Sequence, residues 1–184
     1  MHVTEAVLAQ LRARYGEPRP LVWDGEVAAD ELALAGRSPS RRHDVTFFVF
    51  NGDRLALIRK PHYTANLWRP PGGGTRPDER FEEGVGREAL EELGVEIELE
   101  RFLVATTARF RHGRSTIDWR TLVFSARTEA DVLDPLDLHE IAEARWGTAD
   151  ELAGPIRASL LGTRRPLWRY RVALHDEALA ALRA

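Results

Sequence analysis

The stretch 72-GGGTRPDERFEEGVGREALEELGV-95 places six glutamates behind a glycine-rich turn. Its pattern predicts a helix over residues 79–93, with Asp78 as the N-cap and Gly94 as the C-cap. At about 100° per residue, one side of this helix carries an apolar stripe. The residues of the stripe are Val85, Ala89, Leu90 and Leu93. We therefore expect the helix to pack this face against a hydrophobic core.

A second face of the same helix is acidic. Glu88, Glu91 and Glu92 fall within one arc, because i,i+3 and i,i+4 neighbours lie on adjacent turns. Like charges so placed destabilise a helix by roughly 0.2–0.5 kcal/mol per pair, and a bound cation would remove that penalty. Oxygen ligands without cysteine or clustered histidine favour Mg²⁺ or Mn²⁺, which suits metal-assisted attack of water on phosphorus. The alternative is a merely solvated acidic face, which fits Glu82 and Glu83.

The full spacing of residues 73–95 resembles the signature of the Nudix family, G-x5-E-x7-R-E-U-x-E-E-x-G-U, in which U is aliphatic. The matching positions are Gly73, Glu79, Arg87, Glu88, Ala89, Glu91, Glu92, Gly94 and Val95. Ala89 is the one soft match, because it is small for an aliphatic position. Residues 67–73 and 140–146 resemble flanking segments of the same family, so the resemblance runs from near residue 41 to near residue 152.

The resemblance implies an α/β fold, with an α/β/α sandwich around a mixed β-sheet. It also implies a divalent-metal-dependent hydrolase of a nucleoside diphosphate linked to another moiety. Glu88 and Glu92 would bind Mg²⁺ or Mn²⁺ together with the backbone carbonyl of Gly72. Glu91 would be a further ligand or would hold the attacking water.

Other roles implied by the resemblance concern proton transfer and support of the helix. The general base differs among family members, so Glu91 in the box and Glu140 on a later loop are both candidates. A solvated loop acid is the alternative interpretation of Glu140. Glu79 and Arg87 would form an internal ion pair that orients the helix.

Candidate substrate contacts lie near the glycine-rich turn and on later strands. Arg59, Lys60 and Arg69 could contact substrate phosphate, although each could also be an ordinary surface cation. Phe110, His112 and Trp119 could stack on a base, with Trp119 more typical of a core position. A group of arginines interleaved with aromatic residues hints at a nucleic-acid surface, but the net charge of −3 argues against one. That group comprises Arg164, Arg165, Trp168, Arg169, Tyr170 and Arg171.

The rest of the chain divides into three parts. Residues 1–40 form an N-terminal extension, predicted as a helix over 3–15 and at most short elements over 16–42. Residues 41–155 would form the hydrolase domain that the resemblance implies, and we expect residues 156–184 to form a helical C-terminal tail packed on the core. The predicted strands are 45–50, 55–58, 99–109, 116–126 and 143–146, and the predicted helices after them are 150–161 and 167–182.

Composition narrows the remaining classes. The 184 residues include no cysteine, which excludes disulfides, thiolate zinc sites and a cysteine nucleophile. No signal peptide or membrane span is expected, because the longest apolar run, 45–50, is far below the roughly 20 residues that a span needs. We expect a cytoplasmic protein with a small-molecule diphosphate substrate and no membrane partner.

Two alternatives to an active hydrolase follow from the same resemblance. One is a non-catalytic Nudix module that senses or regulates through a nucleotide ligand, although such relatives commonly lose box carboxylates. The other, an isopentenyl diphosphate isomerase of related fold, depends on a cysteine that this chain lacks. The sequence does not indicate the substrate, because residues 106–112 carry neither the proline nor the tyrosine signature of known subfamilies. Residues 1–40 could form a cap or a dimer-swapping element, and the latter would make the protein a homodimer.

Overall fold

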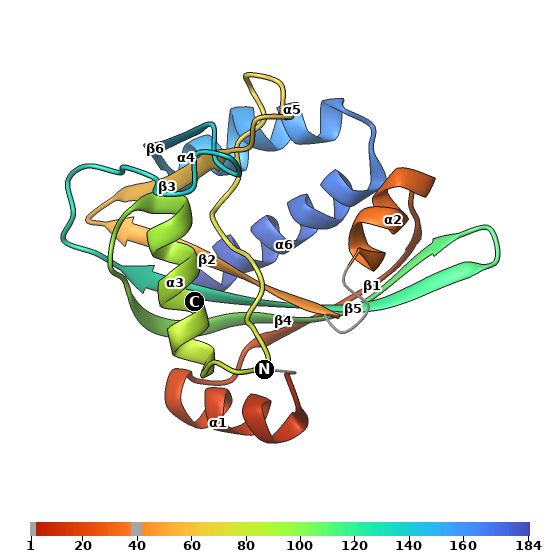
Figure 1. Cartoon of the computed structure of the whole chain (residues 1–184), viewed down its shortest axis with the longest axis horizontal. Helices are drawn as coiled ribbons and strands as arrows, with labels where there is room; N and C mark the ends of the chain where they lie inside the picture. The colour runs from red at the N-terminus through yellow and green to blue at the C-terminus, as the bar shows by residue number, and fades with distance from the viewer. Residues whose placement is uncertain (1–2, 38–41) are drawn as a thin grey trace.

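A mixed six-stranded sheet forms the middle layer of the protein, in the order β1-β4-β5-β2-β3-β6. The structure is a computed structural model that describes residues 3–37 and 42–184 (Figure 1). The strands are β1 (Arg19–Glu26), β2 (His43–Asn51), β3 (Arg54–Arg59), β4 (Glu98–His112), β5 (Ser115–Arg127) and β6 (Glu143–Thr148). The pairs β1–β4 and β2–β5 are parallel and the other pairs are antiparallel. These strands confirm the five that the sequence predicts and add β1.

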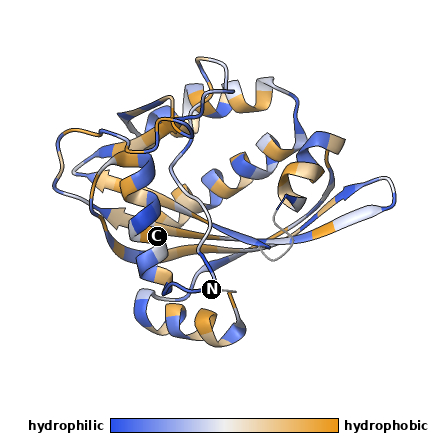
Figure 2. Ribbon diagram, in the orientation of Figure 1, coloured by the Kyte–Doolittle hydropathy of each residue, from blue (hydrophilic) through white to orange (hydrophobic). Residues whose placement is uncertain are grey.

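Helices cover both faces of this sheet, which confirms the predicted α/β/α sandwich. They are α1 (Glu5–Tyr15), α2 (Ala29–Gly36), α3 (Phe81–Leu93), α4 (Ala149–Glu151), the π-helical turn η1 (Leu152–Ile156), α5 (Arg157–Gly162) and α6 (Pro166–Leu182). One core lies between the sheet and α1 with α3, and the other lies between the sheet and α2, η1, α5 and α6. Figure 2 shows the hydrophobic residues gathered where the helices meet the sheet.

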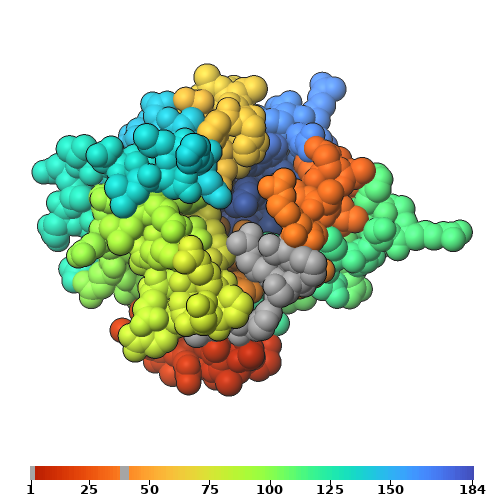
Figure 3. All heavy atoms as spheres, in the orientation of Figure 1, coloured from red at the N-terminus to blue at the C-terminus, as the bar shows by residue number. Residues whose placement is uncertain are grey.

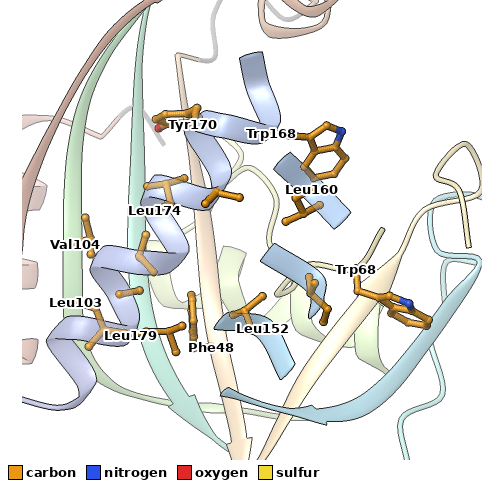
Figure 4. Packing of buried hydrophobic residues seen from close by; sticks show 14 of the residues in the cluster. Phe48, Trp68, Leu103, Val104, Leu152, Leu160, Trp168, Tyr170, Leu174 and Leu179 are labelled. Carbon is orange, nitrogen blue, oxygen red and sulfur yellow. The ribbon is translucent and has the colours of Figure 1, made fainter. Parts of the chain in front are cut away.

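The larger core sits under α6 (Figure 4). Phe48 of β2 lies there beside Leu179 of α6, and Leu174 of α6 belongs to the same cluster; all three are at most 5% exposed. Burying a side chain of this size contributes about 1.5–3 kcal/mol. The C-terminal helix is therefore fixed to the sheet, and its first turn has a defined place next to the cleft described below.

The glycine-rich loop is held against β2. Strands β2 and β3 pair only beside their turn, at Phe50 with Leu55 and Asn51 with Arg54. The chain after β3 then enters the gap between them, where the Val45 N–H donates to the Gly73 carbonyl at 2.8 Å and the Phe47 N–H donates to the Pro71 carbonyl at 3.0 Å. These bonds place residues 71–73 next to the edge of β2 that faces the box helix.

The box helix differs from its prediction at its start and at one apolar position. Helix α3 begins at Phe81, and the Arg80 N–H donates to Glu83 Oε2 at 3.0 Å, so neither Glu79 nor Asp78 has the predicted place. Glu79 stays outside the helix because its carboxylate is bonded to Arg87. Leu90 was predicted in the core but is 38% exposed, because the buried face follows the i,i+4 row that Phe81 begins.

The N-terminal segment contains more structure than its sequence predicts. Strand β1 pairs in parallel with β4 from Arg19 with Val104 to Glu26 with Arg111, and α2 follows it. Pro20 argues against a strand at the level of sequence. A proline is nevertheless tolerated on an edge strand, because the outer side of such a strand needs no hydrogen bonds to a neighbouring strand. Residues 38–41, at the end of the predicted 16–42 segment, lie outside the described residues. Among the described residues, no helix combines the length and apolar character needed to cross a membrane.

A buried histidine in α6 makes stability depend on pH. Burial lowers the pKa of His175 from its ordinary value of 6.5 to about 3, and the cations of Arg171 and Arg69 act in the same direction. The unfolded chain therefore takes up a proton that the folded chain refuses, and stability falls as the pH drops below about 6.5. Between pH 7 and pH 5, the free energy of unfolding of His175→Leu should therefore fall by about 2 kcal/mol less than that of the wild type, as measured by urea unfolding.

The matched control for this prediction is His139→Leu, at an exposed position on the loop before β6. It should keep the pH dependence of the wild type. Equal losses of unfolding free energy in wild type and His175→Leu over this range would contradict the prediction.

Candidate active site

A cleft of about 640 Å³ runs from the box helix to the start of α6. One end is lined by the glycine-rich loop, by residues of α3 and by the loop before β6, and the other end is lined by α2, the far part of β4 and β5, and α6. Figure 3 shows the hollow between α2 (orange) and the segment after β3 (yellow), with atoms of α6 (dark blue) at its base. Glu88, Glu91, Glu92, Gly72 and Glu140 all line this cleft.

Glu92 is the most enclosed of the box carboxylates, at 3% exposure. Its Oε2 accepts a hydrogen bond from the Gly72 N–H at 2.6 Å. Its Oε1 lies 3.5 Å from Arg69 Nη2 and 3.6 Å from Lys60 Nζ. Two cationic side chains and a backbone N–H thus surround the Glu92 carboxylate where it lines the cleft.

Arg87 connects the remaining carboxylates of the box. It donates to both carboxylate oxygens of Glu79, at 2.8 and 3.1 Å, which is the expected ion pair. It also donates to Glu88 Oε1 at 3.0 Å, to Glu91 Oε2 at 2.8 Å and to the Gly74 carbonyl at 3.0 Å. These hydrogen bonds raise the pKa of Arg87, and the Arg87 bond lowers the pKa of Glu79. Arg87 therefore offsets part of the repulsion among the carboxylates, which from the sequence alone was expected to be removed by a bound metal ion.

Glu88 keeps a carboxylate whose charge is less well compensated. Burial raises its pKa, and the charges of Glu92 and Glu91 raise it as well, against the bond from Arg87. A Cβ built on Gly73 would lie 2.0 Å from Glu88 Oε2, so only glycine lets this carboxylate approach the loop. The site is thus a set of oxygen donors whose negative charge is only partly offset by neighbouring cations, and this chemistry fits Mg²⁺ or Mn²⁺.

The carboxylates do not form a ready-made cage. Within residues 3–37 and 42–184, no group of three or more His, Asp or Glu side chains stands close enough to hold a metal ion. Glu91 is turned toward Arg87, and its Oε1 lies 3.7 Å from Arg76 Nη2. The assignment of Glu88, Glu92 and Gly72 as ligands, with Glu91 as a fourth, therefore stays a prediction.

The loop before β6 brings the second candidate base to the cleft. Glu140 is 63% exposed, and its Oε2 accepts a hydrogen bond from Lys60 Nζ at 2.8 Å. Lys60 therefore bridges Glu140 and Glu92 across the cleft. Arg59 was predicted beside Lys60 as a substrate contact but does not line the cleft, because its guanidinium pairs with Glu143 at 3.1 Å and lies over the Trp68 ring.

The far end of the cleft contains residues that the sequence placed in other roles. Trp119, expected in the core, lines the cleft and donates from Nε1 to Asp44 Oδ1 at 3.0 Å. Phe110 borders the cleft but is only 2% exposed and packs edge-on against Tyr170. Asp44 was missed, because a single acid before a strand gives no signal in sequence.

The arginine and aromatic group near the C-terminus is divided between the core and the surface, because its aromatic residues are buried while Arg164 and Arg169 are exposed. Trp168 and Tyr170 are at most 9% exposed, and Arg165 pairs with Asp30 and Glu31 of α2 at 2.6 and 3.0 Å. The aromatic residues at this spacing are therefore core residues of α6.

Comparison with known proteins places this site in a family. The NUDIX domain profile matches residues 40–165, which include the whole box and both candidate bases. This chain belongs to the NUDIX family. A NUDIX hydrolase from Nitrosomonas europaea has a similar fold, with a TM-score of 0.51 and 24% identity over 76% of this chain and 88% of that one.

Curated relatives share only part of their length with this chain. The NAD-capped RNA hydrolase NudC of Pseudomonas syringae pv. syringae is 32% identical over 124 residues, which are 67% of this chain and 41% of that protein. The mitochondrial NAD(P)H pyrophosphatase NUDT13 of Homo sapiens is 29% identical over 126 residues, 65% of this chain and 34% of that protein. The chain thus spans about two fifths, 37 to 41%, of the length of the NudC relatives.

Proposed function

We propose that this protein hydrolyses the diphosphate linkage of nucleotides in which a nucleoside diphosphate is joined to another group, with Mg²⁺ or Mn²⁺ as cofactor. The observation that carries the proposal is the oxygen-lined wall of the cleft, which includes Glu88, Glu92 and Gly72 and where Glu92 lies next to the cations of Arg69 and Lys60. Dinucleotides of the NAD type are the first substrates to test, because two of the similar proteins are named for NAD-containing substrates.

In the proposed reaction, Glu88, Glu92 and the Gly72 carbonyl hold the cation. When bound, the cation neutralises charge on the diphosphate and makes the attacking water more acidic. A new bond forms between the water oxygen and one phosphorus, and the bond from that phosphorus to the bridging oxygen breaks. The other phosphate leaves with the bridging oxygen.

The proton of the attacking water goes to a glutamate, and the two candidates differ in their surroundings. Glu91 is held by Arg87 beside the proposed metal ligands. Glu140 reaches the cleft from a loop and is held by Lys60, a residue that substrate phosphate could attract away. A general base must lie within hydrogen-bond reach of the water, so the two glutamine variants, Glu91→Gln and Glu140→Gln, distinguish the candidates by their loss of kcat.

Arg69 and Lys60 are the cations best placed to meet the substrate. Arg69 is 2% exposed and lines the cleft next to Gly72 and Glu92. Lys60 is the more accessible, with a side chain that is 20% exposed. Either could form charge-assisted hydrogen bonds to a phosphate oxygen that enters the cleft.

The test is a hydrolysis screen on the purified full chain with Mg²⁺ or Mn²⁺. The panel contains NADH, NAD⁺, ADP-ribose, nucleotide sugars, dinucleoside polyphosphates, nucleoside triphosphates and 5′-capped RNA, with products separated by chromatography. We expect at least one nucleoside diphosphate derivative to be cleaved to two phosphate products, and we expect a chelator to abolish that cleavage. Nucleotide binding without metal-stimulated cleavage of any panel member would instead support the non-catalytic sensor.

A further inference from the structure

We infer that Asp44 binds the ribose hydroxyls of a nucleotide, with the base held beyond it between Trp119 and α2. The inference deepens the proposed function and rests on it only in taking a nucleotide as the ligand. It assigns a sugar-selecting residue at a position outside the box, on the first residues of β2.

Only one of the two carboxylate oxygens of Asp44 accepts hydrogen bonds from the described part of the protein. Its Oδ1 accepts hydrogen bonds from Trp119 Nε1 and from the Thr121 hydroxyl. Its Oδ2 lies 3.7 Å from Arg171 Nη2 and accepts no hydrogen bond from the described part of the chain. An ionised carboxylate oxygen can accept two hydrogen bonds, so Oδ2 keeps acceptor capacity. Since Asp44 lines the cleft and its side chain is 15% exposed, a ligand can reach it.

The position of Asp44 along the cleft matches the order of groups in a nucleotide. Asp44 directly precedes Val45, whose N–H donates to the Gly73 carbonyl of the glycine-rich loop at 2.8 Å. On the opposite side, the partner of its Oδ1 is Trp119, which lines the far end of the cleft. A diphosphate at the loop would therefore place its ribose near Asp44 and its base near Trp119.

The far end has the surface that a base needs. It is lined by the aromatic side chain of Trp119 and by the apolar side chains of Leu34, Ala35 and Leu167. Aromatic and apolar walls stack bases with little preference among them. This wall depends on α2, which α6 holds in place: the Leu167 N–H and Arg165 Nε both donate to Glu31 Oε1, at 3.4 and 3.0 Å.

A purely structural role is the competing explanation for Asp44. Its bonds connect β2 to Trp119 and Thr121 of β5, and loss of these bonds would lower stability. A structural residue would change the affinity for ribonucleotides and deoxyribonucleotides by the same factor. A ribose-binding residue would change their ratio.

The experiment measures that ratio by calorimetry with nucleoside monophosphates, which contain no diphosphate linkage to cleave. AMP, its 2′-deoxy analogue and its 3′-deoxy analogue are titrated into the full chain in the presence of Mg²⁺. Because a hydrogen bond to a charged group is a strong one, we expect wild type to bind AMP about tenfold more tightly than at least one analogue. In Asp44→Asn this preference should fall to about twofold or less.

Two further variants separate the sugar from the base and from the fold. Leu34→Asp changes a side chain that is 53% exposed at the end of the cleft proposed to hold the base. It should lower the affinity for AMP and for both analogues by the same factor. Asp118→Asn, an exposed acid paired with Arg109, should change neither affinity nor preference. The melting temperature of each variant reports whether it remains folded.

Three outcomes overturn the inference. The first is that wild type binds AMP and both deoxy analogues with nearly equal affinity. The second is that folded Asp44→Asn keeps the wild-type ratio of these affinities. The third is that wild type binds none of the monophosphates. The hydrolysis screen judges the proposed function separately. Ribose selectivity lost in Asp44→Asn, without cleavage of any panel member, would refute the hydrolase and support the role of Asp44.

Discussion

Glu92→Gln lowers metal-dependent turnover by about a thousandfold, which corresponds to about 4 kcal/mol of transition-state stabilisation. The substitution keeps the shape of the side chain and removes its charge. The Gly72 N–H can still donate to the amide oxygen, so the loop stays in place. The cation loses one of its proposed ligands, and this loss carries the effect. The measurement is kcat/KM on the best substrate of the screen.

The same variant should also lose stability. Arg69 is buried, and Glu92 lies 3.5 Å from it, so removing the carboxylate leaves the guanidinium less compensated. A cost of about 1–3 kcal/mol in unfolding free energy is expected, with a cooperative transition retained. Glu82→Gln is the matched control, because Glu82 lies on the same helix but outside the cleft. Turnover of Glu92→Gln within a few-fold of wild type would remove Glu92 from the proposed metal site.

Gly72→Ala reduces the unfolding free energy by about 4 kcal/mol or more, or prevents folding altogether. The Gly72 backbone has φ of 153°, which other residues rarely adopt. An added Cβ would lie 2.1 Å from the Val45 carbonyl oxygen and 2.8 Å from the Thr46 Cα. Both are backbone atoms of β2, which cannot move without disturbing the pairing of that strand with β5. Thermal and urea unfolding measure the loss.

Gly86→Ala is the matched control for this substitution. Gly86 lies in the middle of α3, and an added Cβ there meets no atom within 4 Å. Because alanine favours the helix over glycine, this variant should gain about 0.5–1 kcal/mol in unfolding free energy. A Gly72→Ala protein as stable as wild type would show that the loop does not need glycine at this position.

The box helix illustrates how far local sequence information reaches. Its apolar face, its acidic face and its end at Gly94 depend on residues a few positions apart, and helix geometry fixes how such residues face. The strands after it could be predicted because β-branched and aromatic runs favour a pleated surface. The predicted start of α3 was wrong because Glu79 pairs with Arg87 across the loop and does not belong to the helix, which begins at Phe81.

The N-terminal segment and the far end of the cleft show where that information ends. Prolines and glycines hide the alternation of Leu21 and Trp23, which point into the core only because β4 offers a paired edge. Trp119 belongs to a strand pattern, and nothing in that pattern tells whether its ring meets the core or the cleft. Such assignments depend on which distant element packs against each face.

The sequence by itself determined the family, the box helix and the residue types that a divalent cation would need, because periodic spacing within one helix survives folding unchanged. Only the tertiary structure decided how the charges are shared. Arg87 divides its hydrogen bonds among Glu79, Glu88 and Glu91, whereas Glu92 is left to Arg69 and Lys60 from the segment after β3. The placement of Asp44 and α2 beside the same cleft is equally a product of long-range pairing, because β2 and β5 meet there and α6 holds α2 in place.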